Sequence, residues 1–247
     1  MKVLLTAMAL AGLAGVANAA TVSFATSRGW NQGVNTYTGD GYTVNVNAAR
    51  HNSSTGEIIS YDAYTASWSG SYGGAGACSY PDPVDPYRLD DKTSVGSNST
   101  AYCDESHQID GYYYDEILEL DWVDTTVSLK QLVFSYVNQH DYYDDFDLAL
   151  YSGDGVEFYQ QSIDIKSNGV EKYCNNSYDL CVYSVDVSSY NLIGSVIGVG
   201  ASDKKAAFKL KKVKFHEVEV IPLPAAGFLL LGGLGGLLAL RRRKPRA

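Results

Sequence analysis

The chain has 247 residues, 45% of them hydrophobic and 19% charged, which suffices for one large domain or two small ones with a buried core. Its 19 Lys and Arg residues against 28 Asp and Glu residues give a net charge of −9. Proteins that bind nucleic acid need a basic face to displace counterions from phosphate, so this acidic balance argues for no nucleic-acid partner.

The pattern of residues 1–19 predicts a signal peptide. Lys2 gives the positive start, an apolar run follows from Val3 to Val16, and Ala17-Asn18-Ala19 supplies the small residues that signal peptidase accepts. The alternative is a first transmembrane helix, but the run is shorter than the ~20 residues that cross a bilayer. We therefore expect export by the Sec machinery into an oxidising compartment, followed by cleavage.

Residues 20–220 have the pattern of a secreted all-β domain, because apolar and polar residues alternate with a period near two. Gly-rich turns separate these runs, and a parity shift in the last run predicts a bulge near Lys211 and Lys212. Eight or more short strands of this kind predict an antiparallel β-sandwich, jelly-roll-like in topology. The expected strands are Tyr42–Ala48, Ile58–Trp68, Leu118–Trp122, Leu129–Val137, Phe146–Leu150, Val156–Ile165, Tyr183–Val187, Val196–Val199 and Phe208–Val220.

The segment from Gly70 to Cys103 interrupts the alternation. It contains Gly73-Gly74 and a cluster of three prolines, with few apolar residues at regular spacing. A loop of this length inside a compact domain is either functional or an insertion. We expect residues 70–103 to form a loop insertion in the sandwich.

Four cysteines allow three disulfide pairings. The sequential pairing, Cys78 with Cys103 and Cys174 with Cys181, needs the least reorganisation and closes the two most loop-like segments. Loop closure gives these bridges roughly 3–4 and 2–3 kcal/mol of stabilisation. A zinc site is the alternative, which the lack of a C-x-x-C pair and the export signal disfavour.

The sequence holds none of the common catalytic motifs: no G-x-S-x-G, no H-E-x-x-H and no G-x-x-x-x-G-K-[ST]. Four histidines, His51, His107, His140 and His216, are scattered without ligand spacing, and we expect them at the surface. We therefore expect a protein that is not an enzyme. A glycan hydrolase, which needs two opposed carboxylates, is the remaining enzymatic alternative.

One stretch is dense in acidic residues, with five carboxylates within fourteen residues: Asp141, Asp144, Asp145, Asp147 and Asp154. These groups repel one another unless they are solvated or neutralised, and Ca²⁺ takes oxygen ligands from such loops. We name Asp144, Asp145 and Asp147 as candidate Ca²⁺ ligands. The EF-hand spacing fails, however, and Asp145 and Asp147 alternate with apolar residues, so a solvated strand and loop is the alternative.

Tyrosine is the other excess, with 20 residues. Aromatic faces stack on sugar rings and hydroxyls donate hydrogen bonds, which is one route to a glycan-binding surface. The alternative is the ordinary preference of strands for tyrosine. The tyrosines in or beside expected loops are Tyr61, Tyr64, Tyr72, Tyr80, Tyr87, Tyr112, Tyr113, Tyr114, Tyr142 and Tyr143.

The C-terminal residues 221–247 consist of a short proline motif, an apolar stretch and a basic cluster. Fifteen helical residues from 226 to 240 reach only ~23 Å, and the four before them bring the length near the ~30 Å of a bilayer core. We expect a single transmembrane helix with the basic cluster on the cytoplasmic side and the body outside. The motif is Ile221-Pro222-Leu223-Pro224-Ala225, and the cluster is Arg241-Arg242-Arg243-Lys244.

This order of features resembles the PEP-CTERM class of bacterial sorting signals, and residues 221–225 resemble its VPLPA-CTERM variant, with Ile221 in place of the first Val. The resemblance covers about 27 residues. It implies a Gram-negative bacterium and recognition by an exosortase, a membrane-embedded cysteine transpeptidase that cuts near the proline motif. It also implies a precursor anchored in the inner membrane that is then released to the cell surface or outside the cell.

The body resembles the small ectodomains that precede such sorting tails, a resemblance that brings no catalytic residues with it. The matching stretches are Asp115–Trp122, Val127–Val137, Asp144–Leu150 and Gly198–Val213. The sequence thus predicts an exported, non-enzymatic surface or extracellular-matrix protein linked to exopolysaccharide or biofilm. A carbohydrate-binding module, Ca²⁺-dependent through the aspartates above, is the alternative.

Overall fold

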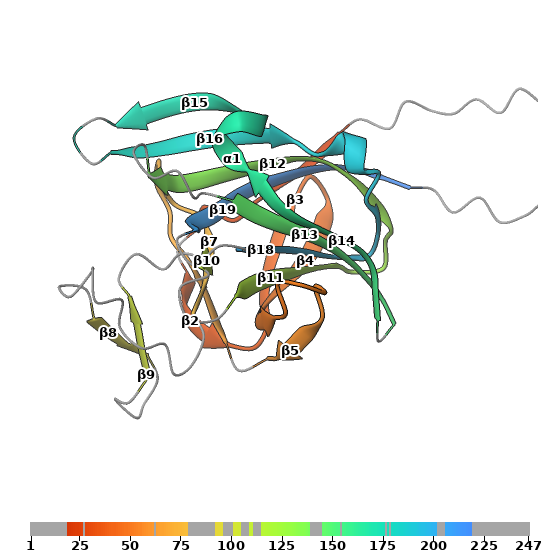
Figure 1. Cartoon of the computed structure of the whole chain (residues 1–247), viewed down its shortest axis with the longest axis horizontal. Helices are drawn as coiled ribbons and strands as arrows, with labels where there is room; N and C mark the ends of the chain where they lie inside the picture. Colours follow the sequence, from red (N-terminus) through yellow and green to blue (C-terminus); the bar gives the residue numbers. More distant parts are fainter. Residues whose placement is uncertain are drawn as a thin grey trace, which may run out of the picture. The chain divides into compact units, whose positions relative to one another are not determined.

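The computed structural model describes residues 19–26, 28–61, 63–78, 92–95, 101–104, 109–110, 115–138, 145–153, 155–175, 177, 179–201 and 206–218. Nearly all of these residues lie in antiparallel strands, which form two large sheets (Figure 1). The two sheets share a common hydrophobic core. The predicted all-β sandwich is therefore confirmed. Residues 218–247 form a separate unit, of which only Val218 is described.

The larger sheet, which we call sheet A, has ten strands. Three short strands extend it: β1 (Ala20–Ser23) and β10 (Ile109–Asp110) pair with β19, and β17 (Ile193–Gly194) pairs with β12. The other seven follow one another in the order β15 (Gly169–Asn175), β16 (Leu180–Asp186), β12 (Val127–Asn138), β19 (Ala207–Glu217), β7 (Ala75–Cys78), β6 (Tyr64–Ser67) and β2 (Arg28–Gln32).

The smaller sheet, sheet B, has seven strands. Strand β5 (Ile58–Ser60) pairs with β4 beside the main path. The other six strands of sheet B follow the order β14 (Gly155–Asp164), β13 (Asp145–Ser152), β18 (Val196–Ala201), β11 (Glu116–Trp122), β4 (Tyr42–His51) and β3 (Asn35–Gly39). A separate pair consists of β8 (Lys92–Val95) and β9 (Ala101–Asp104).

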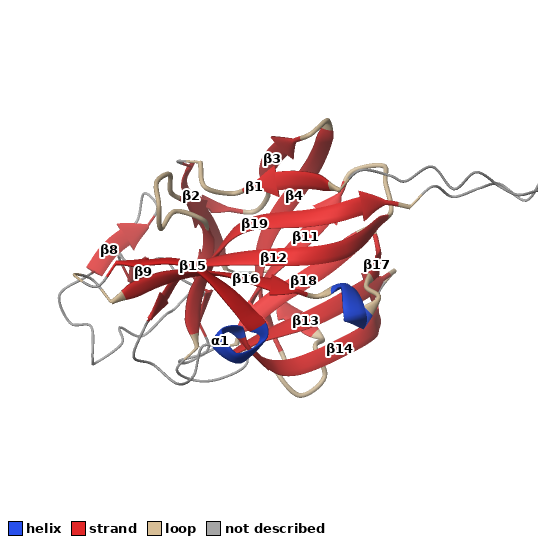
Figure 2. Ribbon diagram, turned by 90° about the horizontal axis from the view of Figure 1, so that it is seen from above, coloured by secondary structure: helices blue, strands red, loops and turns tan. Residues whose placement is uncertain are grey.

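Helix is confined to two short turns in the described residues, α1 (Ile165–Asn168) and the 3₁₀ turn η1 (Ser188–Tyr190) (Figure 2). Asp164 caps α1 by accepting a hydrogen bond from the Ser167 N–H at 2.6 Å. No helix in the described part of the chain is long and apolar enough to cross a membrane. The predicted transmembrane helix and residues 1–18 of the predicted signal peptide lie outside the described residues.

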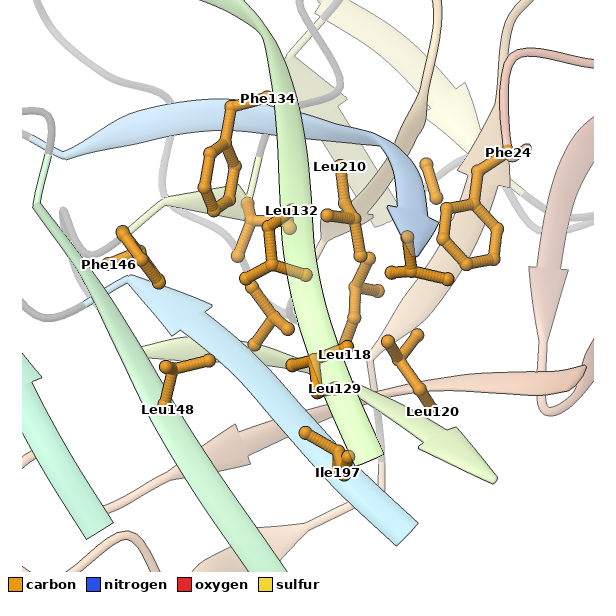
Figure 3. Packing of buried hydrophobic residues seen from close by; sticks show 14 of the residues in the cluster. Phe24, Leu118, Leu120, Leu129, Leu132, Phe134, Phe146, Leu148, Ile197 and Leu210 are labelled. Atoms are coloured by element: carbon orange, nitrogen blue, oxygen red, sulfur yellow. The ribbon is translucent and has the colours of Figure 1, made fainter. Parts of the chain in front are cut away.

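Aromatic side chains from both sheets meet in the core. Phe134 of sheet A lies against Phe146 of sheet B with ring centroids 4.6 Å apart, and Trp122 of sheet B meets Phe215 of sheet A at 5.5 Å. Leu118 and Leu120 point into the same core from β11, as the alternation predicts (Figure 3). Burial of each such side chain stabilises the fold by about 1.5–3 kcal/mol.

The predicted bulge in the last strand is confirmed. Val133 of β12 pairs with Lys212, whereas the next residue, Phe134, pairs with Leu210, so Lys211 is left over on β19. The extra residue restores the inward direction of the apolar side chains on both sides of it.

Two expectations about segments are wrong. The expected strand 58–68 is two strands: β5 pairs with β4 in sheet B, whereas β6 pairs with β2 and β7 in sheet A, so the chain passes between the sheets after Ser60. The expected loop 70–103 contains β7, whose residues Ala75-Gly76-Ala77-Cys78 are all buried. Small side chains carry little hydrophobic alternation, which is why the sequence concealed this strand.

Candidate functional site

The outer face of sheet B carries a second layer of side chains. On β18, Ile197 and Val199 point into the core, so Gly198 and Gly200 face outward. A Cβ at Gly198 would lie 2.9 Å from Tyr151 Cε2, and one at Gly200 would lie 2.9 Å from His51 Cε1. The two glycines therefore make room for an aromatic ring and an imidazole above the sheet.

His51, Asp147 and Tyr159 form a hydrogen-bonded network on this face. The side chains of His51 and Asp147 are fully buried, with Nε2 3.3 Å from Oδ2. The Tyr159 hydroxyl donates to Asp147 Oδ2 and lies 3.3 Å from His51 Nε2. His51 Nδ1 donates to the Asp115 carbonyl at 2.8 Å, and Asp147 Oδ1 accepts from the Ser162 N–H at 2.9 Å. Because all four polar atoms of the pair are used inside the protein, the network joins strands and offers a substrate no access.

The expectation that every histidine lies at the surface is wrong for His51, which is 2% exposed. Its partners Asp115, Asp147 and Tyr159 follow it by 64, 96 and 108 positions. No local sequence pattern links residues so far apart, so only the strand register brings them together.

The same tyrosines hold the loop of residues 52–57 against the sheet. The Tyr159 hydroxyl lies 2.9 Å from the Ser53 carbonyl, and the Tyr151 hydroxyl donates to the Gly56 carbonyl at 2.9 Å. Gly56 has a φ of +75°, and a Cβ there would overlap the Tyr159 ring. The loop therefore needs glycine at this position for both backbone conformation and space.

Beside this loop, the outer face of sheet B is hollowed into a groove of about 850 Å³. Three of the seven exposed large hydrophobic side chains in the described part of the chain line it: Ile59, Tyr61 and Ile193. Exposed apolar side chains that gather in a groove mark a surface suited to a ligand. The complete lining is Glu57, Ile58, Ile59, Ser60, Tyr61, Glu119, Thr126, Tyr151, Ser152, Gly153, Gly155, Val156, Glu157, Ile193, Gly194, Ser195 and Val196.

A tyrosine and a carboxylate form the polar centre of this groove. The Tyr61 hydroxyl donates to Glu119 Oε2 at 2.9 Å. Partial burial, followed by the hydrogen bond to Glu119, raises the pKa of Tyr61 to about 12, so the hydroxyl stays protonated at neutral pH. Burial also raises the pKa of Glu119, with a further contribution from the charge of Asp121 and an opposing one from the Tyr61 hydrogen bond. Burial and the charge of Glu119 raise the pKa of Tyr151.

The candidate Ca²⁺ ligands are not brought together in the described part of the chain. Asp144 lies outside the described residues, Asp145 is half-buried opposite Asp164 in the β13–β14 pair, and Asp147 belongs to the buried network. Since His51 and hydrogen-bond donors already occupy the carboxylate of Asp147, a cation would have to displace them. The Ca²⁺ site stays a prediction.

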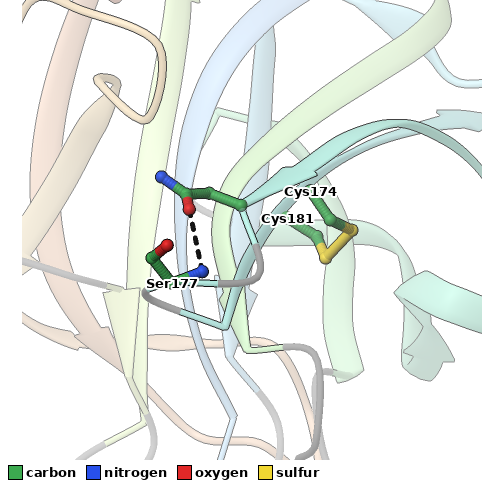
Figure 4. Close-up of a disulfide and its surroundings, with 4 residues drawn as sticks. Cys174, Ser177 and Cys181 are labelled. Carbon is green, nitrogen blue, oxygen red and sulfur yellow. Dashed lines mark hydrogen bonds between the residues drawn. A yellow bond between two sulfur atoms is a disulfide. The ribbon is translucent and has the colours of Figure 1, made fainter.

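The predicted disulfide between Cys174 and Cys181 is confirmed. The two residues are direct partners on β15 and β16, with Cα atoms 4.1 Å apart. In the turn between them, the Ser177 N–H donates to Asn175 Oδ1 at 2.9 Å (Figure 4). The bridge therefore closes a hairpin that is already hydrogen-bonded.

Cys78 is also disulfide-bonded, and the side chain of its predicted partner Cys103 lies outside the described residues. Among the described residues, one group of three potential metal ligands lies close together: Glu171, Cys174 and Cys181. Because the two cysteines are oxidised, this group has a single carboxylate to offer a metal.

Of the tyrosines expected to form a binding surface, Tyr61 lines the groove. Tyr64 lies on β6 in sheet A, and Tyr72 lies against the Tyr173 ring with centroids 5.5 Å apart. Tyr80, Tyr87, Tyr112–Tyr114 and Tyr142–Tyr143 lie outside the described residues. The sequence reasoning missed Tyr151, although the alternate glycines of β18 signalled a large neighbour on the outer face.

Comparisons of the chain with protein-family models, with curated proteins and with solved structures found no match.

Proposed function

We propose that this protein is exported, sorted by an exosortase to the cell surface or extracellular matrix, and binds carbohydrate there without turning it over. The observation that carries the binding is the groove on sheet B, where Tyr61, Tyr151 and Glu119 come together. Exopolysaccharide, the predicted partner, is the ligand that such a location would present.

The lining suits a sugar because a sugar ring has apolar C–H faces and a rim of hydroxyl groups. Tyr61, Ile59 and Ile193 offer exposed apolar surface to the faces. Glu119 accepts hydrogen bonds from hydroxyl groups, and the Ser152 and Ser195 side chains both donate and accept. The volume of about 850 Å³ lies within the ~300–1,000 Å³ typical of small-molecule sites.

The sorting step rests on the sequence of residues 221–247, with its proline motif, apolar stretch and arginine cluster. The last strand of the sandwich ends at Glu217, directly before this tail. We propose that the apolar stretch is a transmembrane helix that anchors the precursor until the exosortase cuts near Pro222 and Pro224. A jelly-roll connectivity of the body and a role in biofilm belong to the same proposal.

Glycan arrays with the full chain test the binding. We expect the exported protein, in mild detergent, to retain at least one glycan class and Tyr61→Ala to weaken that binding about tenfold. Tyr173→Ala, which removes an exposed tyrosine from sheet A, is the matched control and should bind normally. If no glycan is retained, or Tyr61→Ala binds like the wild type, the groove is not a carbohydrate site.

Two further measurements separate the alternatives. Loss of binding in EDTA would favour the Ca²⁺-dependent module through Asp144, Asp145 and Asp147. Release of reducing ends from the bound glycan would show that the protein hydrolyses it, which would contradict binding without turnover.

Intact mass and cell fractionation test the sorting step. We expect the wild type to lose the residues beyond about Leu223. The double variant Pro222→Ala, Pro224→Ala should remain full-length in the inner membrane. If both proteins keep the arginine tail, the tail is only an anchor.

A further inference from the structure

We infer that the groove on sheet B prefers glycans with free amino groups, such as glucosamine oligomers, over neutral and anionic glycans. The inference rests on the proposed carbohydrate binding and adds the charge of the ligand to it. Four features of the described residues carry it: the carboxylates of the groove, the environment of Glu119, the aromatic rings beside Glu119, and the position of the lysines.

The groove is lined by carboxylates without cationic partners among its described lining residues. Glu57 and Glu157 are exposed, Glu119 is half-buried, and no Lys, Arg or His side chain is part of that lining. One cation lies next to the lining: Arg50 donates a hydrogen bond from Nε to Oγ of the lining residue Ser60 at 2.9 Å. One positive charge does not balance the three glutamates, so the groove keeps a negative field. Charges of one sign in a concave site attract ligands of the opposite sign and repel ligands of the same sign.

Glu119 is suited to receive an ammonium group. Its Oε2 accepts the Tyr61 hydroxyl, while Oε1 has no hydrogen-bond partner among the described residues. Burial has removed part of the water around this carboxylate, which raises its pKa. A cationic donor at Oε1 would replace the lost hydration with a charge-assisted hydrogen bond, which is about twice as strong as a neutral one.

The aromatic rings beside Glu119 favour the same ligand charge. Tyr61 and Tyr151 both line the groove, and the Tyr151 ring lies over Gly198. A cation within ~6 Å of an aromatic face is attracted to the ring electrons, and an amino sugar combines that cation with C–H faces that stack. Neutral sugars use only the stacking.

The lysines of the last strand do not offset the charge of the groove. On β19, Val213 and Phe215 point into the core, so Lys212 and Lys214 face outward from sheet A. The groove lies on the outer face of sheet B, so the hydrophobic core separates it from these two lysines. An anionic polysaccharide would therefore meet repulsion in the groove.

Three hexasaccharides measured against the full chain test the inference: fully deacetylated chitohexaose, its N-acetylated form, and an oligogalacturonate of equal length. We expect the amino form to bind about tenfold more tightly than the acetylated form and the uronate not to bind. Added salt should weaken binding of the amino form and leave that of the acetylated form unchanged.

A charge-neutral variant locates the effect. Glu119→Gln keeps the shape of the side chain and should lose about tenfold in affinity for the amino form, with little change for the acetylated form. Glu171→Gln removes one charge from an exposed position on β15 and should bind like the wild type. Circular dichroism of both variants confirms that they are folded.

The outcomes separate this inference from the proposed function. Equal affinity for the amino and acetylated forms, or tighter binding of the acetylated form, overturns the charge preference and leaves carbohydrate binding standing. Glu119→Gln with wild-type affinity for the amino form also overturns it. If none of the three probes binds while the array shows another glycan, the preference is wrong; if no glycan binds at all, the proposed function fails with it.

Discussion

Replacement of Tyr159 by Phe tests the buried network of His51, Asp147 and Tyr159. The change keeps the ring that lies against Gly56 and removes only the hydroxyl, which contacts Asp147 Oδ2 and the Ser53 carbonyl. The hydroxyl has a single proton, which it donates to Asp147 Oδ2, so the nearby Ser53 carbonyl adds no second hydrogen bond. Loss of a hydrogen bond to a buried carboxylate costs about 1.5–3 kcal/mol, and loss of one to a neutral acceptor costs about 0.5–1.5 kcal/mol. We therefore expect Tyr159→Phe to lower the free energy of unfolding by about 1.5–3 kcal/mol.

Tyr151→Phe is the matched control on the same face. Its hydroxyl makes one hydrogen bond, to the Gly56 carbonyl, so the expected loss is about 1 kcal/mol. Urea unfolding of the oxidised protein, monitored by tryptophan fluorescence, gives both values, provided that the free energy of unfolding depends on urea concentration with the same slope in all the proteins compared. If Tyr159→Phe loses no more stability than Tyr151→Phe, the hydrogen bond between Tyr159 and Asp147 does not stabilise the fold as expected.

The pH dependence of the same variant has a definite sign. Burial and the hydrogen bond to Asp147 raise the pKa of Tyr159 above its ordinary value of 10.0. Stabilisation by the protonated hydroxyl is thus fully present below that value and is lost as the pH rises through the folded-state pKa. The stability gap between wild type and Tyr159→Phe should be constant up to about pH 10 and narrow above it.

Three further predictions concern the groove and the disulfide. Burial raises the pKa of Glu119 above 4.5, so the stability linked to its protonated form is lost as the pH rises. Between about pH 4 and pH 7, the free energy of unfolding of Glu119→Gln should therefore increase relative to that of the wild type, and a constant difference would contradict this. Gly198→Val should displace the Tyr151 ring, cost about 1–3 kcal/mol on urea unfolding and weaken glycan binding. Replacing Cys174 and Cys181 by Ser should cost about 2–3 kcal/mol by the same measurement, and an unchanged midpoint would show that the hairpin does not need its bridge.

The sequence predicted those parts of the fold that depend on local alternation. Strands with large apolar residues, such as β11 and β13, were expected close to their observed bounds, and the parity of the apolar residues around Lys211 placed the bulge. Strand β7 was missed because Ala, Gly and Cys leave no contrast between its two faces. The jelly-roll connectivity and the tail stay predictions.

The site was less accessible from the sequence because it depends on register. Tyr61 was named as a sugar-binding candidate, but its partner Glu119 lies 58 positions away and joins it only when β5 and β11 flank β4. One of the candidate metal ligands, Asp147, occupies a buried position next to His51. The alternation of one strand shows that a carboxylate points away from the core. It does not show whether side chains from other strands cover that carboxylate.

Strand β19 has consequences for the order in which the domain is completed. It is the last strand of the sandwich, yet it pairs with β12, β1, β10 and β7. The register joins Ala20 to Phe215, residues from opposite ends of the domain. Long-range pairing of this kind folds slowly, in milliseconds to seconds for all-β domains. A chain interrupted during synthesis before residue 207 therefore lacks the strand that unites sheet A, and it should remain open to proteases until β19 has emerged.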